Sequence, residues 1–141
     1  MFSKLPSAWI CGVRLREIDE HHAVVSVPYK WLSQNPFKST YFACQAMAAE
    51  MSTGVLSMGH VYQRNPGVSL LVTKIEGNFL KKATSRVDFT CHDGDAILNT
   101  VEKAITSGEA QTIMATSTGV NSNGETVSEF KVEWSFKVRG K

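Results

Sequence analysis

The segment from Ala43 to Gly54 constrains the fold most, because it is predicted to be a helix that carries very little side chain. Alanines stand at positions 43, 46, 48 and 49, and a glycine follows at 54. A helix this bare cannot build a broad apolar stripe of its own, but it lets other backbones come very close. We therefore expect it at the centre of the molecule, with a curved sheet wrapped tightly around it.

One carboxylate interrupts this run of small residues. By helical spacing, Glu50 shares a face with Ala43, Ala46, Met47, Gly54 and Ser57. A carboxyl group on such a surface has little room for water, and burial favours its neutral form. The pKa of Glu50 is therefore expected to be raised, which suits a general base or a nucleophile working near neutral pH.

The composition excludes several classes of protein. The 141 residues are enough for one domain, with 43% hydrophobic and 20% charged residues, as in an ordinary globular protein. A net charge of +2 leaves no dense basic stripe for nucleic acid. The three cysteines are widely spaced without a C-x-x-C motif, so neither a disulfide framework nor a metal site is expected. The start of the chain lacks the apolar run of a signal peptide, and no stretch approaches the ~20 apolar residues of a membrane span, so we expect a cytoplasmic protein.

The hydrophobic pattern predicts six strands and two helices. The last strand gives the clearest signal, since apolar residues from Phe130 to Val138 alternate with polar ones. The expected strands cover residues 9–19, 23–29, 68–80, 86–91, 110–120 and 129–138, and the helices run from Ser39 or Thr40 to about Gly59 or Tyr62 and over 96–105. Short turns between consecutive strands favour an antiparallel sheet. The predicted class is α+β, with the sheet around one long central helix.

This order of elements resembles the hotdog fold, and in particular its thioesterase branch, which includes the phenylacetate-degradation and Them-type acyl-CoA thioesterases and the DUF4442 domains. The family pattern is an Asn, a His-Gly-Gly that begins six residues on, and an acid nine residues after the His. In this chain Asn35 matches the Asn, Tyr41 takes the His position, Phe42-Ala43 takes the Gly-Gly position, and Glu50 takes the acid. Residues 66–69 and 79–83 resemble the third strand of the family and its end.

The resemblance implies a role for each of these residues. Glu50 would be the base or nucleophile, Asn35 would orient water or the carbonyl, and backbone N–H groups from Tyr41 to Ala43 would bind the oxyanion. The side chains expected to contact the substrate are Tyr41, Gln45 and Ser69, and those expected near the phosphates of coenzyme A are Lys81, Lys82 and Arg86. The substrate would be a thioester of coenzyme A or of a carrier protein, with no separate cofactor, and neither nucleic acid nor a membrane as partner.

The departures from the family pattern keep other functions open. Phe42 either points away from the oxyanion site or blocks it, and Tyr41 replaces only part of what a histidine does. A non-catalytic acyl-CoA-binding or regulatory hotdog protein is therefore the second reading, and a plain dimeric structural module the third. The acyl-carrier dehydratases rank lower, because Gln45 stands where they carry their glutamate. A hotdog domain normally exposes an edge strand, so we expect a homodimer or a tetramer with sites shared between two chains.

Overall fold

A computed structural model describes residues 12–29 and 42–139. Asn35 and Tyr41, two of the predicted site residues, lie outside the described residues. The elements follow the chain as β1 (Arg14–Ile18), β2 (Ala23–Val27), α2 (Phe42–Val61), β3 (Val68–Phe79), β4 (Val87–Cys91), α3 (Gly94–Ser107), β5 (Gln111–Val120) and β6 (Thr126–Val138).

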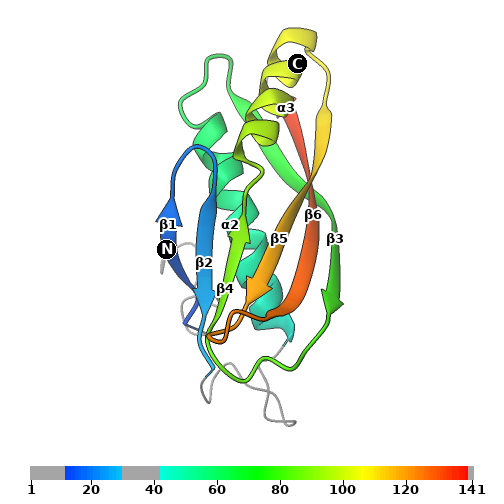
Figure 1. Cartoon of the computed structure of the whole chain (residues 1–141). Coiled ribbons are helices and arrows are strands. Elements are labelled where there is room, and N and C mark those ends of the chain that lie inside the picture. Colours follow the sequence, from blue (N-terminus) through cyan, green and yellow to red (C-terminus); the bar gives the residue numbers. More distant parts are fainter. Residues whose placement is uncertain (1–11, 30–41, 140–141) are drawn as a thin grey trace.

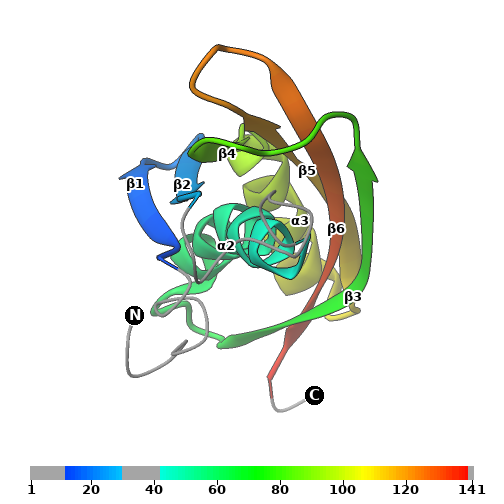
Figure 2. The same ribbon diagram turned by 90° about the horizontal axis from the view of Figure 1, so that it is seen from below.

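The strands form one six-stranded sheet in the order β1-β2-β4-β5-β6-β3, and every neighbouring pair is antiparallel. Figure 2 shows this sheet curving around α2, while α3 lies beside α2 at the end where α2 finishes (Figure 1). This is the α+β hotdog arrangement that the sequence predicted, and the prediction is confirmed. None of the helices in the described ranges is long and apolar enough to cross a membrane.

The bare helix α2 sits at the centre because its small residues let the sheet close around it. Ala48 and Ala49 are fully buried, and the side chains of Ser52 and Thr53 are buried with them. The Ser52 hydroxyl donates to the Ala49 carbonyl and lies 2.7 Å from the Ser117 hydroxyl on β5. A buried hydroxyl is tolerated only when it is hydrogen-bonded, so these bonds allow a helix with few apolar side chains to be buried.

Two glycines permit close approaches elsewhere in the fold. A methyl group added at Gly94, where α3 begins, would lie 2.2 Å from the carbonyl oxygen of Glu20, and the Gly94 N–H donates to the His21 carbonyl at 3.0 Å. A methyl group at Gly119 on β5 would lie 2.6 Å from the Phe89 ring. Only glycine fits at either place, so α3 is held against the β1–β2 turn and the Phe89 ring fills the space over β5.

The predicted boundaries differ from the structure at several ends. β1 was predicted over residues 9–19, but the strand begins at Arg14, and the described residues before it, Gly12 and Val13, are not part of it. β2 was predicted to reach Tyr29 but ends at Val27, just before Pro28. α3 is longer than predicted and β6 begins earlier than predicted, at Thr126, directly after the turn that Gly124 closes with a φ of 81°. Turn geometry, which hydrophobic spacing does not report, sets these ends.

Strand β3 differs most from its prediction. Residues 68–72 are apolar on both sides of the strand, a pattern typical of a strand covered on both faces, but Leu71 is 66% exposed. Beyond this run, Ile75 (46%) and Phe79 (51%) are exposed as well. Among the described strands, β3 pairs with β6 alone, so it forms one edge of the sheet as far as residues 12–29 and 42–139 show. Ile75 and Phe79 lie on the same side of the sheet as Val132 and Phe130, the side that faces α2, beyond the part that α2 covers.

Candidate active site

Glu50 lies near the middle of α2 and is half-buried. A methyl group added at Gly54, one turn further along the helix, would lie 3.6 Å from the Oε1 atom of Glu50 and 3.2 Å from the Trp134 ring. The carboxyl group and the indole therefore border the same small space over Gly54. Glu50 and Gly54 do share a face of the helix, as the sequence predicted.

Burial raises the pKa of the Glu50 carboxyl above its ordinary value. Desolvation is the cause, because water is excluded from part of the carboxylate and the neutral form is favoured. The expectation of a raised pKa is confirmed. A carboxylate whose proton affinity is raised in this way is a stronger base than an exposed glutamate, and perturbed carboxyl groups of this kind gather at functional sites.

A short chain of hydrogen bonds fixes the helix turn that carries Glu50. The Trp134 indole N–H donates to the Thr53 hydroxyl at 2.8 Å, and that hydroxyl donates to the Glu50 backbone carbonyl at 2.8 Å. The Ser57 hydroxyl donates in turn to the Thr53 carbonyl at 3.0 Å. Trp134 and Thr53 were not among the predicted site residues, although Trp134 stands on the dry face of the clearest alternating strand.

The start of α2 lies two turns before Glu50, on the same helix face. Ala43 is half-buried in the first turn, about 10 Å from Glu50 along the helix axis. In the first turn of an α-helix the backbone N–H groups have no acceptor within the helix, and Ala43 stands in the first described turn of α2. Phe42, the first helical residue, is 58% exposed, so its ring is not packed into the core of the single chain.

Gln45 and Ser69 are not brought to Glu50 in the single chain. Gln45 is 4% exposed, and its Oε1 atom accepts a hydrogen bond of 2.8 Å from the Ser128 hydroxyl on β6. Five residues along a helix correspond to a rotation of about 140°, so Gln45 and Glu50 face different sides of α2. Ser69 pairs with Lys137 on the outer face of the sheet and accepts a hydrogen bond from Arg139 at 3.1 Å. The alternation of β3 turns Ser69 away from the helix.

The predicted phosphate-binding residues follow β3, at the end of the molecule where α2 begins (Figure 1). All three side chains are exposed. Lys81 pairs with Glu125, and Arg86 pairs with Asp88 at 3.1 Å. Lys82 takes part in no ion pair with the described residues. The structure therefore places these three cations at one end of the protein, close to one another in the chain.

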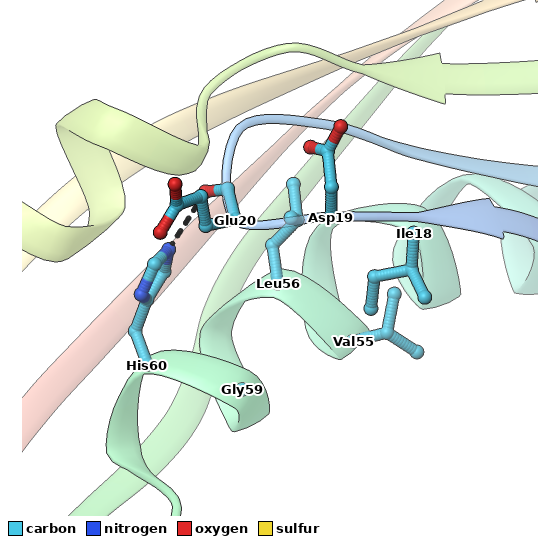
Figure 3. Close-up of a pocket in the computed structure, with 7 residues that line it drawn as sticks. All are labelled: Ile18, Asp19, Glu20, Val55, Leu56, Gly59 and His60. Carbon is cyan, nitrogen blue, oxygen red and sulfur yellow. Dashed lines mark hydrogen bonds between the residues drawn. The ribbon is translucent and has the colours of Figure 1, made fainter.

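Two cavities lined by described residues lie nearer the other end of α2. The first, of about 350 Å³, is drawn in Figure 3 and lies between the β1–β2 turn and α2; His60 approaches the Glu20 carbonyl there at 3.0 Å. The second, of about 340 Å³, includes Tyr62 and Arg139 in its wall. Glu50 lines neither cavity. No cluster of His, Cys, Asp and Glu in the described ranges is arranged to hold a metal ion.

Solved structures with the same fold cover almost the whole chain. A protein of unknown function from Pseudomonas aeruginosa, described as a probable thioesterase, superposes with a TM-score of 0.85 at 16% identity, over 98% of this chain and 91% of its own. A protein of unknown function from Chlorobaculum tepidum gives 0.83 at 15% identity, over 98% and 90%. A thioesterase from Haemophilus influenzae gives 0.66 at 12% identity, over 96% and 85%.

At these identities the structural matches establish the fold, and the family is established by sequence. No curated protein matches the chain significantly. The model of the family called "Domain of unknown function (DUF4442)" matches residues 1–136, which include the helix that carries Glu50 and the strand that carries Trp134. The chain therefore belongs to the DUF4442 family, and it has the hotdog fold.

Proposed function

We propose that the protein hydrolyses acyl thioesters, with Glu50 as the general base. One observation carries the proposal: a half-buried carboxyl group with a raised pKa lies on the bare face of the central helix, two turns from the start of that helix. Hydrolysis needs a base or nucleophile, donors for the developing oxyanion, and a slot that aligns the thioester. The likeness to solved hotdog proteins described as thioesterases supports the same reaction class.

In the proposed reaction the Glu50 carboxylate takes a proton from a water molecule. The resulting hydroxide attacks the thioester carbonyl carbon, and the tetrahedral intermediate then expels the thiolate, which receives a proton. The alternative is direct attack by Glu50, giving an anhydride that water hydrolyses. In both routes the backbone N–H of Ala43, at the positive end of the helix dipole, would donate to the oxyanion. One well-placed donor of this kind lowers the barrier by about 3–4 kcal/mol.

The proposed substrate carrier is coenzyme A or an acyl-carrier protein. Lys81, Lys82 and Arg86 lie at the same end of the molecule as the start of α2 and are exposed to solvent. A phosphate group bound there would extend its pantetheine arm toward the first turn of α2. Because Lys81 and Arg86 already pair with carboxylates, Lys82 is the cation that we expect to contribute most to phosphate binding.

We further propose that two copies of the chain pair along β3 and share each site. A long edge strand with exposed apolar side chains invites pairing with another chain, whereas the opposite edge, β1, is a five-residue strand with charges at Arg14, Arg16 and Glu17. A two-fold pair would cover Ile75 and Phe79 with one contact. Asn35 of the second copy would then orient the attacking water or the carbonyl.

Release of free thiol from a panel of acyl-CoA thioesters tests this proposal. We expect a kcat/KM of about 10⁴ M⁻¹s⁻¹ or more for at least one acyl chain, the lower end of the usual enzymatic range. Calorimetric titration with the same thioesters provides the comparison. Tight binding of acyl-CoA without any turnover would contradict hydrolysis and favour an acyl-binding or regulatory role. The ring of Phe42, which is exposed at the start of α2 where the oxyanion would bind, is the feature that favours this alternative.

A further inference from the structure

Glu50 and Trp134, a side chain from the sheet, border the same space over Gly54. The Cζ2 and Cη2 atoms of Trp134 lie 3.2 and 3.4 Å from the point where a Gly54 side chain would begin, and the Oε1 atom of Glu50 lies 3.6 Å from it. Any larger residue at position 54 would occupy this space. The missing side chain therefore lets the edge of a large apolar ring approach the carboxyl group.

The indole is held in this place by a specific bond. Trp134 is 6% exposed, and its only polar atom, Nε1, donates to the Thr53 hydroxyl at 2.8 Å. That hydroxyl donates to the Glu50 carbonyl oxygen at 2.8 Å, so the Thr53 hydroxyl accepts one hydrogen bond from the sheet and donates one within its own helix. The ring and the backbone of Glu50 are thereby tied to one atom, and rotation of the indole away from Gly54 would leave a buried N–H without an acceptor.

In the described ranges, β2 and β5 carry no charged side chain, and Asp88 of β4 pairs with Arg86. The charged residues of α3 (Asp95, Glu102 and Lys103) and Arg16 and Glu17 of β1 are exposed, and Arg14 of β1 bonds to the Val13 carbonyl. On α2 the other ionisable side chains in the described range are Cys44 and His60, and His60 bonds to the Glu20 carbonyl. The charged residues of β6 and β3 lie on the outer face of the sheet: Glu129, Lys131, Glu133 and Lys137 on β6, and Lys74 and Glu76 on β3. Desolvation thus acts on Glu50 without an opposing charge from these strands.

We propose that Trp134 is a positioning residue for Glu50: its indole, anchored on the Thr53 hydroxyl, closes one side of the carboxyl group to water across the gap left by Gly54. The inference rests on the proposed function for its purpose, since a base with raised proton affinity is what thioester hydrolysis requires near neutral pH. Its physical content is independent of activity, because the protonation of Glu50 can be measured directly.

The test is an NMR titration of the Glu50 carboxyl in protein labelled with ¹³C-glutamate, with the resonance assigned from Glu50→Gln. Trp134→Phe removes the N–H and the second ring, and we expect the titration midpoint of Glu50 to move down toward that of an exposed glutamate. Thr53→Val keeps the shape of the threonine but removes the acceptor, and should act in the same direction. Thr53→Ser keeps the hydroxyl and should titrate like the wild type.

Each outcome decides the inference. A midpoint that is unchanged or raised in Trp134→Phe overturns it, and equal shifts in Thr53→Val and Thr53→Ser overturn the anchoring by the hydroxyl. If Trp134→Phe fails to fold, the comparison of the two Thr53 variants decides instead. Where hydrolysis is measurable, the acid limb of kcat/KM should shift with the midpoint. A protein that hydrolyses no thioester but shows the shift would remove the proposed function and leave this inference standing.

Discussion

Replacing Glu50 with glutamine is expected to lower the kcat of thioester hydrolysis by about 10²–10⁴-fold, the usual contribution of a general base. The amide keeps the size of the side chain and its place beside Gly54, but it cannot accept a proton from water. KM should change little, because the residues proposed to bind the carrier of the substrate, Lys81, Lys82 and Arg86, lie elsewhere on the chain. Single-turnover hydrolysis of the best acyl-CoA, with wild type and variant side by side, measures this effect.

The same substitution at Glu109 is the matched control, because Glu109 is exposed in the turn before β5. Glu109→Gln should leave kcat unchanged. Stability provides a second control. The raised pKa of Glu50 means that the folded chain binds this proton more tightly than the unfolded chain, so the free energy of unfolding falls as the pH rises through the pKa of the folded carboxyl. Glu50→Gln should therefore be at least as stable as the wild type at pH 7, and a rate within threefold of wild type would remove Glu50 from the mechanism.

Placing a lysine at Ile75 is expected to abolish the dimer and to reduce the activity more than tenfold. Ile75 is 46% exposed on the α2-facing side of the edge strand β3, opposite Val132. In the proposed pair this side chain is covered by the second copy, and burying an unpaired ammonium group there would cost several kcal/mol. Light scattering at micromolar concentration should show a dimer or tetramer for the wild type and a monomer for Ile75→Lys, with hydrolysis reduced more than tenfold.

Met114→Lys is the control for this experiment. Met114 is 37% exposed and stands on β5, in the interior of the sheet, where it pairs with Glu133. The change adds the same charge at an exposed apolar residue away from the β3 edge, so assembly and activity should be retained. A folded monomer for the wild type, or an Ile75→Lys protein that stays dimeric and active, would contradict the shared site.

The fold was predictable because its two strongest signals are local. Alternation from Phe130 to Val138 identifies a strand with one dry face. The alanines at positions 43, 46, 48 and 49, followed by Gly54, identify a helix that only a tightly wrapped sheet can cover. Strand ends were less predictable, since β1 and β6 begin where turns allow. The exposure of β3 was missed because a run of apolar residues on an edge strand has the same pattern as one in a covered strand.

The candidate site was predictable only where one element carries it. Glu50 and Gly54 share a helix face by spacing alone, and the structure has them side by side. The contact of Trp134 with Thr53 joins residues 81 positions apart, and nothing in the sequence says which helix turn the indole meets. Ser69 was expected to face the substrate, but the register of β3 against β6 turns it outward, and one residue of register decides that direction.

The most direct test of the account compares two pKa values. The pH dependence of kcat/KM reports the ionisation of the free enzyme's base, and ¹³C titration reports the ionisation of the Glu50 carboxyl itself. We predict that hydrolysis falls as the pH drops through a single ionisation, and that its midpoint coincides with that of Glu50 and lies above the ordinary glutamate value of 4.5. An acid limb that persists in Glu50→Gln, or a carboxyl that titrates well away from the kinetic midpoint, would contradict the assignment of Glu50 as the base.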